Sequence, residues 1–298
     1  MYGTLSRILK EARPHQWVKN LIVFAALIFS QHFADGALFL RTLLGFVAFC
    51  LLSGGIYIFN DIADLETDKL HPAKKSRPLA LGELGVVEAS VGAGAFIVTG
   101  MIISLLLGPS FAGVSAVYLI FSVLYSLYLK RVIILDALII SIGFILRAIA
   151  GVEVLRGHVA AIDLSPWLLV CTLFLALFMA FGKRRHERYL LDEKAMEHRS
   201  TLGEYSLDFL DGLIYALMSA TVISYSIYTI WPATVEKFHS RNMVLTIPFV
   251  VYGIFRYAFL VTQKKEGGNP SELLLRDVPL IVTVILWFLS VLLILYVS

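Results

Sequence analysis

Three aspartates lie close together in one short stretch of the sequence, at Asp61, Asp64 and Asp68, directly after Asn60. Spacings of three and four residues place these carboxylates on one face of a helix. Like charges stacked in this way repel one another unless a cation lies among them. Carboxylate and amide oxygens suit Mg²⁺, which usually takes further ligands from water and substrate phosphates. We therefore predict a Mg²⁺ site formed by Asn60, Asp61, Asp64 and Asp68, with the three aspartates as catalytic groups.

A basic run follows the aspartates and includes Lys74, Lys75 and Arg77. Alone, such a run is typical of a loop on the cytoplasmic side of a membrane. Beside a metal-binding acidic face, its cations suit phosphate oxygens, and the combination suits a diphosphate leaving group. We predict that Lys75 and Arg77 bind substrate.

The elements that carry these residues are predicted to be membrane helices. Hydrophobic residues make up 58% of the 298-residue chain, and the mean hydropathy is +0.81. A helix that crosses the hydrocarbon core needs about 20 apolar residues. Nine runs meet this requirement, at 18–34, 38–59, 86–107, 110–129, 132–152, 165–182, 208–231, 243–262 and 278–297. We predict an all-α integral membrane protein with nine transmembrane helices in a single domain, residues 1–298.

Charge supports one orientation in the membrane. The 25 Lys and Arg residues gather mostly in the N-terminal segment and in alternate loops, which predicts a cytoplasmic N-terminus and a cytoplasmic acidic motif. A net charge of +3, without a continuous basic stripe, argues against nucleic-acid binding. Cys50 and Cys171 both lie in apolar runs and indicate neither a disulfide framework nor a zinc site.

The acidic motif, followed by Lys75, Arg77 and Pro78, resembles the first aspartate-rich motif of the UbiA superfamily of intramembrane prenyltransferases, and nine helices fit that fold. Many members carry a second aspartate-rich motif after the sixth helix. Here that position reads Phe181 to Tyr189, with Lys183, Arg184 and Arg185 and with Glu187 as its one acid. The exchange of acids for bases implies more phosphate binding and less metal binding than in those members.

The chain also resembles one group within that superfamily, the decaprenyl-phosphate phosphoribosyltransferases. The similarity lies in the acidic motif and in segments 13–20, 143–151, 182–184, 256–258 and 275–277. It implies Mg²⁺-dependent transfer of 5-phosphoribose from phosphoribosyl diphosphate to a polyprenyl phosphate of the decaprenyl type, with release of pyrophosphate, for a cell-envelope polysaccharide precursor. It also implies an inner-membrane location. The sequence leaves the oligomeric state open, including a homo-oligomer.

Six further residues are predicted to bind substrate: Lys19, Tyr125, Lys130, Lys183, Arg184 and Glu187. Of these, Glu187 would orient a basic neighbour or the ribose. For Tyr125 and Lys130, anchoring at the membrane interface is an equal alternative. Arg147 and Arg256 lie within predicted spans. An Arg within a span needs a polar interior or a partner, and for Arg147 a structural pairing is an equal alternative to a functional role. For Arg256, either phosphate binding or snorkelling to the interface accounts for its position.

Two other functions remain open. One is an ordinary UbiA-type prenyltransferase that moves a prenyl chain to an aromatic acceptor. The other is a transporter, whose acids would normally lie near the midplane of the membrane rather than at a helix end.

Overall fold

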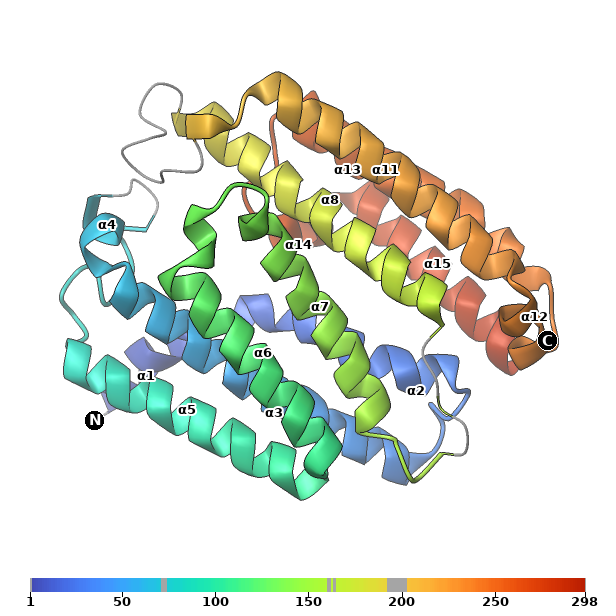
Figure 1. Ribbon diagram of the computed structural model, residues 1–298, viewed down its shortest axis with the longest axis horizontal. Helices are drawn as coiled ribbons and strands as arrows, with labels where there is room; N and C mark the ends of the chain where they lie inside the picture. The colour runs from blue at the N-terminus through green and yellow to red at the C-terminus, as the bar shows by residue number, and fades with distance from the viewer. Residues whose placement is uncertain (1, 71–73, 160–161, 163–164, 192–202, 298) are drawn as a thin grey trace. The chain divides into compact units, whose positions relative to one another are not determined.

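Figure 1 shows the computed structural model, which describes residues 2–70, 74–159, 162, 165–191 and 203–297. The regular secondary structure of these residues is helical, apart from one isolated bridge between Arg156 and Val159. The prediction of an all-α fold is confirmed. The chain divides into two compact units, Met1–Ile139 with Leu146–Ile162 and Ile140–Ile145 with Asp163–Ser298.

The first unit contains the long membrane helices of the N-terminal half and several short elements between them. Its elements are α1 (Tyr2–Glu11), η1 (Pro14–Phe24), α2 (Ala25–Phe29), α3 (Gly36–Ala63), α4 (Leu65–Leu70), α5 (Val86–Leu107), α6 (Pro109–Leu127), η2 (Leu129–Arg131) and most of α7 (Leu135–Glu153). Helices α3 and α5 pack closely. A Cβ atom on Gly55 would lie 2.6 Å from a side-chain carbon of Ile97 and 3.0 Å from the carbonyl oxygen of Ala93, so a glycine at this position permits the contact.

The second unit follows the same pattern of long apolar helices and short connecting ones. Its elements are α8 (Pro166–Leu191), α11 (Leu207–Ile230), α12 (Pro232–Phe238), η4 (Asn242–Thr246), α13 (Ile247–Thr262), α14 (Pro270–Arg276) and α15 (Val278–Tyr296). Local sequence fixes where two of them begin. The Ser206 hydroxyl accepts a hydrogen bond from the Phe209 N–H at 3.1 Å, and the Asp277 carboxylate accepts one from the Leu280 N–H at 3.0 Å, as expected of N-cap residues.

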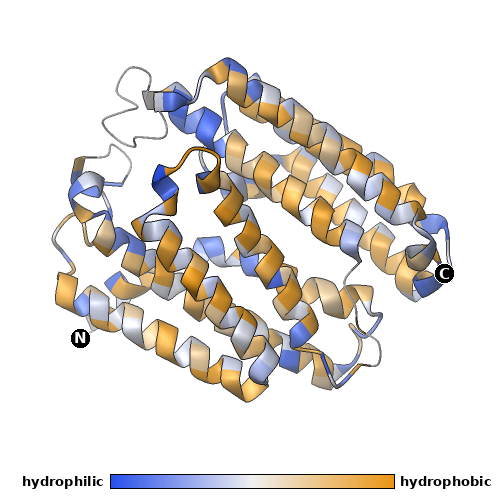
Figure 2. Cartoon of the chain, in the orientation of Figure 1, coloured by the Kyte–Doolittle hydropathy of each residue, from blue (hydrophilic) through white to orange (hydrophobic). Residues whose placement is uncertain are grey.

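Eight helices among the described residues are long and apolar enough to cross a membrane. They correspond to the predicted spans from 38–59 onward. Figure 2 shows hydrophobic residues along most of their length and hydrophilic residues gathered near many of their ends. Helices α3 and α8 continue beyond the predicted ends at residues 59 and 182. This extension carries Asn60 and Asp61 on α3 and the whole 183–188 segment on α8.

The count of nine membrane helices is not confirmed, because segment 18–34 is not one long α-helix. It consists of the end of the 3₁₀-helix η1, the five-residue helix α2 and the turn that follows. A 3₁₀-helix rises about 2.0 Å per residue and an α-helix about 1.5 Å, so the summed lengths of η1 and α2 along their axes are about 30 Å. Hydropathy records the apolar length of a segment but not the type of helix it forms.

Packing holds η1 against α7. A Cβ atom on Gly151 of α7 would lie only 2.3 Å from the carbonyl oxygen of Val23. Only glycine permits this approach of helix to backbone.

Candidate functional site

The acidic motif lies where α3 gives way to α4. Helix α3 ends at Ala63, Asp64 follows as its C-cap residue, and α4 begins at Leu65. Backbone hydrogen bonds from Asp64 N–H to Asn60 O (2.9 Å) and from Asp68 N–H to Asp64 O (2.8 Å) continue the helical pattern across the junction. The aspartates therefore keep the predicted i, i+3, i+7 order, although two helices rather than one carry them.

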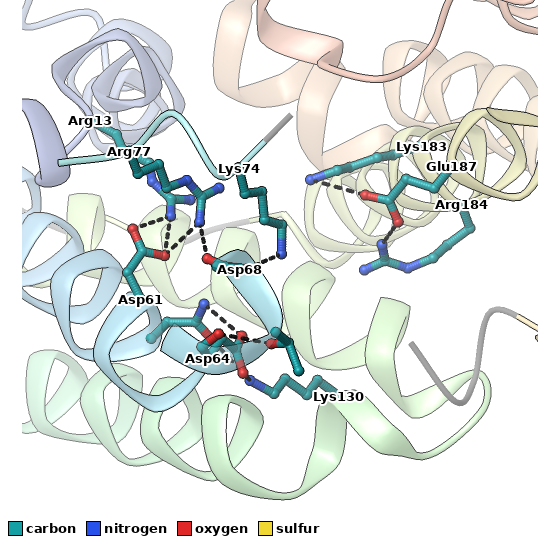
Figure 3. A network of polar contacts seen from close by, with 12 residues as sticks. Arg13, Asp61, Asp64, Asp68, Lys74, Arg77, Lys130, Lys183, Arg184 and Glu187 are labelled. Atoms are coloured by element: carbon teal, nitrogen blue, oxygen red, sulfur yellow. Dashed lines mark hydrogen bonds and ion pairs between the residues drawn. The ribbon is translucent and has the colours of Figure 1, made fainter. Parts of the chain in front are cut away.

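Basic side chains contact all three aspartates, as Figure 3 shows. We use the name first polar network for this group, all of it in the first unit: Arg13, Asn60, Asp61, Asp64, Asp68, Lys74, Arg77 and Lys130. The cations that the repulsion among the aspartates demands are therefore supplied by the protein's own arginines and lysines.

Two of the aspartates share one guanidinium group. The Arg77 Nη1 atom donates to Asp61 Oδ1 at 2.9 Å and to Asp68 Oδ2 at 2.5 Å. Arg13 Nη2 also donates to the Asp61 carboxylate, at 2.5 Å from Oδ2, and Lys74 Nζ lies 2.9 Å from Asp68 Oδ1. Both aspartates are buried, with 2% of their surface exposed. Each buried negative charge is thus paired, as a charge removed from water requires.

The third aspartate has a separate set of partners. The Lys130 ammonium group donates to Asp64 Oδ1, and the Asn60 amide donates to Asp64 Oδ2 at 3.2 Å. Lys130 also lies 3.5 Å from Asn60 Oδ1. The Asp64 side chain keeps 20% of its surface exposed, which makes it the most accessible carboxylate of the three.

The donor atoms of this network fit Mg²⁺ in chemistry, since they are carboxylate and amide oxygens. Within the described chain, however, no three His, Cys, Asp or Glu side chains converge closely enough to hold a metal ion by themselves. Mg²⁺ commonly binds proteins through one or two carboxylates and completes its shell with water and phosphate oxygens. The arrangement therefore fits an ion shared with a phosphate ligand better than a cage made by the protein alone.

Three residues of this region were not predicted from the sequence: Glu11, Arg13 and Lys74. Arg13 and Lys74 each stood in a segment already noted, but only the structure shows that they contact aspartates. Glu11 gave no signal, because it is a single acid in a basic N-terminal segment. Burial raises the pKa of the Glu11 carboxyl to about 7; a hydrogen bond from the Leu79 N–H opposes this shift, and the neighbouring Asp61 adds to it.

The remaining predicted residues of the first unit differ in how far they are exposed. Lys75 is exposed, so its neighbours Lys74 and Arg77, rather than Lys75 itself, hold the aspartates. Lys19 is partly buried on η1, and Tyr125 is partly buried near the end of α6.

The predicted second motif lies on the part of α8 that extends beyond the predicted span, and it belongs to the second unit. Arg184 Nη1 donates to Glu187 Oε2 at 2.5 Å, and Lys183 Nζ lies 3.6 Å from Glu187 Oε1. Arg184 is buried, whereas the Lys183 side chain is 43% exposed. We call these three residues the second polar network (Figure 3). Its contacts join residues three and four apart, as expected on a helix face.

The next arginine along α8 has a different environment. Arg185 donates to both carboxylate oxygens of Asp211 on α11 and, at 3.1 Å, to the carbonyl oxygen of Val261 on α13. These contacts join three helices of the second unit, so Arg185 has a structural role.

The two arginines within membrane spans are also held by structural contacts. Arg147 donates to Asn20 Oδ1 at 2.7 Å and to the Tyr118 hydroxyl at 2.9 Å. Arg256 forms a bidentate pair with Asp277, at 3.2 and 2.8 Å. This pair lowers the pKa of Asp277, which also caps α15. The alternative of a structural pairing is therefore supported for Arg147, and the pairing of Arg256 with Asp277 is a contact that the sequence did not predict.

Comparison with known proteins identifies the family. The sequence model of the UbiA prenyltransferase family matches residues 21–276. The chain belongs to this family. With eight apolar helices of membrane-spanning length among its described residues, it is an integral, multi-pass membrane protein.

Several relatives in the family carry one name, decaprenyl-phosphate phosphoribosyltransferase. The protein of that name from Mycolicibacterium smegmatis is 34% identical over 95% of this chain and 90% of its own length. The Corynebacterium glutamicum protein is 34% identical over 97% and 87%, and a Mycobacterium tuberculosis protein is 31% identical over 95% and 92%.

Solved structures share the fold at lower identity. A UbiA homolog from Archaeoglobus fulgidus bound to GPP and Mg²⁺ matches with a TM-score of 0.72 and 18% identity, over 97% of this chain and 99% of that one. The apo structure of a UbiA homolog from Aeropyrum pernix K1 matches with a TM-score of 0.68 and 17% identity, over 93% and 96%. The predicted UbiA-like fold is confirmed.

Proposed function

We propose that this protein transfers 5-phosphoribose from phosphoribosyl diphosphate to a polyprenyl phosphate and releases pyrophosphate. The observation that carries the proposal is the basic character of the second motif, where Lys183 and Arg184 lie beside Glu187, the one acid in residues 181–189. A donor with both a diphosphate and a 5-phosphate presents more anionic groups than a prenyl diphosphate does. The names of relatives that match over nearly the whole chain support the same assignment.

In the proposed reaction, an oxygen of the polyprenyl phosphate attacks C1 of the ribose. A new C1–O bond forms, the C1–O bond to the diphosphate breaks, and pyrophosphate leaves with the bonding electron pair. The acceptor phosphate is already ionised at neutral pH, so no strong general base is required. The protein's contribution is then to position the reactants and to stabilise charge on the leaving group.

The first polar network is the proposed site for the leaving diphosphate. Mg²⁺ held by Asn60, Asp61, Asp64 and Asp68 would neutralise phosphate charge; the A. fulgidus homolog bound to Mg²⁺ supports a divalent ion in the family. Arg77 and Lys130 already lie within contact of these aspartates, so their cations are placed to share phosphate oxygens. We propose that Lys19, Lys75, Tyr125, Lys183 and Arg184 bind other parts of the two substrates, and that Glu187 orients Arg184.

We further propose that the N-terminus and both polar networks lie on the cytoplasmic side of the inner membrane, and that the product is a precursor of a cell-envelope polysaccharide. The clustering of Lys and Arg in the segments around both networks supports this orientation. A reporter that is active only in the cytoplasm, fused to the N-terminus, tests it; an inactive reporter on a fusion protein present at normal levels would refute the orientation.

The decisive assay compares two pairs of substrates. Purified protein in Mg²⁺ is incubated with phosphoribosyl diphosphate and polyprenyl phosphate, or with a prenyl diphosphate and 4-hydroxybenzoate. We expect a phosphoribosylated lipid and pyrophosphate from the first pair only, and loss of that product when the metal is chelated. Product from the second pair alone would instead establish the prenyltransferase alternative that the family name suggests.

A further inference from the structure

The segment that carries Arg77 is packed against helix α1. We use the name basic loop for residues 74–84, between α4 and α5. Two of its residues, Leu79 and Leu84, are buried in an apolar cluster with Ala12, which directly follows α1, and Ile58 of α3. Ile8 of α1 packs against the same cluster. The end of α1 therefore lies against both the basic loop and the helix that carries Asp61.

Two charged residues at this end of α1 contact the segments that carry Arg77 and Asp61. The Glu11 carboxylate accepts a hydrogen bond from the backbone N–H of Leu79 at 2.7 Å, two residues after Arg77. Arg13 donates to the Asp61 carboxylate. Glu11 is almost completely buried, with 1% of its surface exposed, and a carboxylate is removed from water at a high free-energy cost unless it has a specific partner.

We propose that Glu11 is a positioning residue: its contact with the Leu79 N–H fixes the basic loop so that the Arg77 guanidinium lies between Asp61 and Asp68. The connection from Leu79 to Arg77 is short and stiff. Pro78 stands between them with a restricted φ angle, and the Pro78 carbonyl oxygen accepts hydrogen bonds from the N–H groups of Glu83 (2.9 Å) and Leu84 (3.2 Å). A shift of Leu79 would therefore move Arg77 as well.

The function of this contact rests on the proposed phosphoribosyl transfer, since Arg77 is proposed to bind the donor diphosphate. A side chain at position 11 that does not reach the Leu79 N–H would misplace Arg77. Donor binding would then weaken although no group that touches the donor had been removed. The effect should appear in the KM for phosphoribosyl diphosphate more than in kcat.

Two conservative substitutions of Glu11 separate the effect of side-chain length from the effect of charge. Glu11→Gln keeps the length of the side chain and an oxygen acceptor for the Leu79 N–H, whereas Glu11→Asp keeps the charge but is one methylene shorter. We expect Glu11→Asp to raise the donor KM about tenfold, equivalent to about 1.4 kcal/mol, and Glu11→Gln to stay within about threefold of the parent. Hydrogen exchange of the peptide that contains Leu79 should become faster in Glu11→Asp only.

A matched control lies on the same two elements. Arg7 of α1 and Glu83 of the basic loop form a 3.7 Å ion pair that is about half exposed, and such surface pairs contribute little. Glu83→Gln should therefore change neither the donor KM nor the exchange of the Leu79 peptide. In an Arg77→Ala background, Glu11→Asp should change the donor KM less than threefold, because the residue it positions is already absent.

The proposal is overturned if Glu11→Asp leaves both the donor KM and the exchange of the Leu79 peptide unchanged, or if the Asp and Gln variants behave alike. It also fails if Glu11→Asp and Arg77→Ala have fully multiplicative effects, or if Glu11→Asp only lowers the melting temperature. The exchange experiment requires no substrate. A parent protein that transferred no phosphoribose would contradict the proposed function, and the exchange rates would still decide whether Glu11 holds the basic loop.

Discussion

The two polar networks are built in different ways. In the first, four of the contacts of the aspartates join residues 9, 16, 48 and 66 positions apart, contributed by several elements of the first unit. In the second, Lys183 and Arg184 contact Glu187 within about one turn of a single helix. The contacts of the first network therefore join separate elements, whereas these contacts of the second lie within α8, where Arg184 is buried and Lys183 is partly exposed.

This difference predicts how each network responds to substitution. A side chain shared among several partners, such as Arg77 between Asp61 and Asp68, couples their energies, so that changes are not additive. Local pairs on a helix face are weakly coupled to the rest of the fold. Substitutions in the first network should combine loss of activity with changes in stability, and substitution of the more exposed Lys183 in the second should act mainly on ligand binding.

The largest effect is expected from the aspartates. Asp61→Asn and Asp64→Asn should each reduce kcat for phosphoribosyl transfer at least a hundredfold, a typical result of removing a group that stabilises charge in the transition state. Asp61→Asn should also lower the melting temperature, since Asp61 is buried against two guanidinium groups; the more exposed Asp64 should affect melting less.

Glu66 provides the control for this pair of variants. It lies between the aspartates in sequence, yet its side chain is 82% exposed and pairs only with Lys69 among the contacts seen. Glu66→Gln should retain the activity and the melting temperature of the parent. Turnover close to that of the parent in Asp61→Asn or Asp64→Asn would refute the proposed site.

A smaller effect is expected in the second network. Lys183→Ala and Arg184→Ala should weaken the binding of phosphoribosyl diphosphate about ten- to a hundredfold, because charge-assisted hydrogen bonds contribute about 1.5–3 kcal/mol. Titration with the donor in Mg²⁺ measures this. Arg185→Ala is the matched control: Arg185 holds Asp211 and Val261, so its loss should lower the melting temperature rather than the donor affinity of the folded protein.

Unchanged donor affinity in both Lys183→Ala and Arg184→Ala would remove the main physical support for the proposed donor. The prenyl diphosphate alternative would then become the better hypothesis.

Arg147 tests whether long-range polar contacts by themselves indicate a catalytic site. Its partners Asn20 and Tyr118 are 127 and 29 residues away, yet they join elements of the fold rather than the aspartate motif. Arg147→Met should destabilise the protein by about 1.5–3 kcal/mol, the scale of hydrogen bonds to a charged group, and leave the Mg²⁺ dependence of the rate unchanged. An altered Mg²⁺ dependence at unchanged stability would instead place Arg147 in the catalytic machinery.

The smallest effect concerns the Arg256–Asp277 pair. Arg256 lowers the pKa of Asp277 below its usual value of 3.8, so the folded state favours the ionised carboxylate. The stabilisation is present above about pH 4 and is lost as the pH falls through the lowered pKa. The difference in melting temperature between the parent and Asp277→Asn should therefore shrink in strong acid. A difference that grew with acidity would contradict the assigned sign.

Most of the fold could be predicted from the sequence, because apolar length is set by the thickness of the bilayer and is visible in composition alone. The eight spans from α3 to α15 were predicted in this way. The nine-helix count is not confirmed, because segment 18–34 combines a 3₁₀-helix and a short α-helix, a distinction that apolar length does not record. The close approach of Val23 to Gly151 in this region joins two residues far apart in the sequence.

The sequence by itself determined the acidic motif, with Asn60, Asp61, Asp64 and Asp68 at helical spacing, and the basic character of the second motif, because both are patterns between near neighbours on a helix. Only the tertiary structure decided which cations meet which carboxylates: Arg13 and Arg77 at Asp61, Lys74 and Arg77 at Asp68, and Lys130 at Asp64. It also decided that Glu11 is buried against the Leu79 N–H. The physical reason is that the contacts of Arg13, Lys130 and Glu11 join residues 48, 66 and 68 positions apart, and those of Lys74 and Arg77 depend on how the loop after α4 folds back. The apolar packing that brings these segments together is absent from any local pattern of residues.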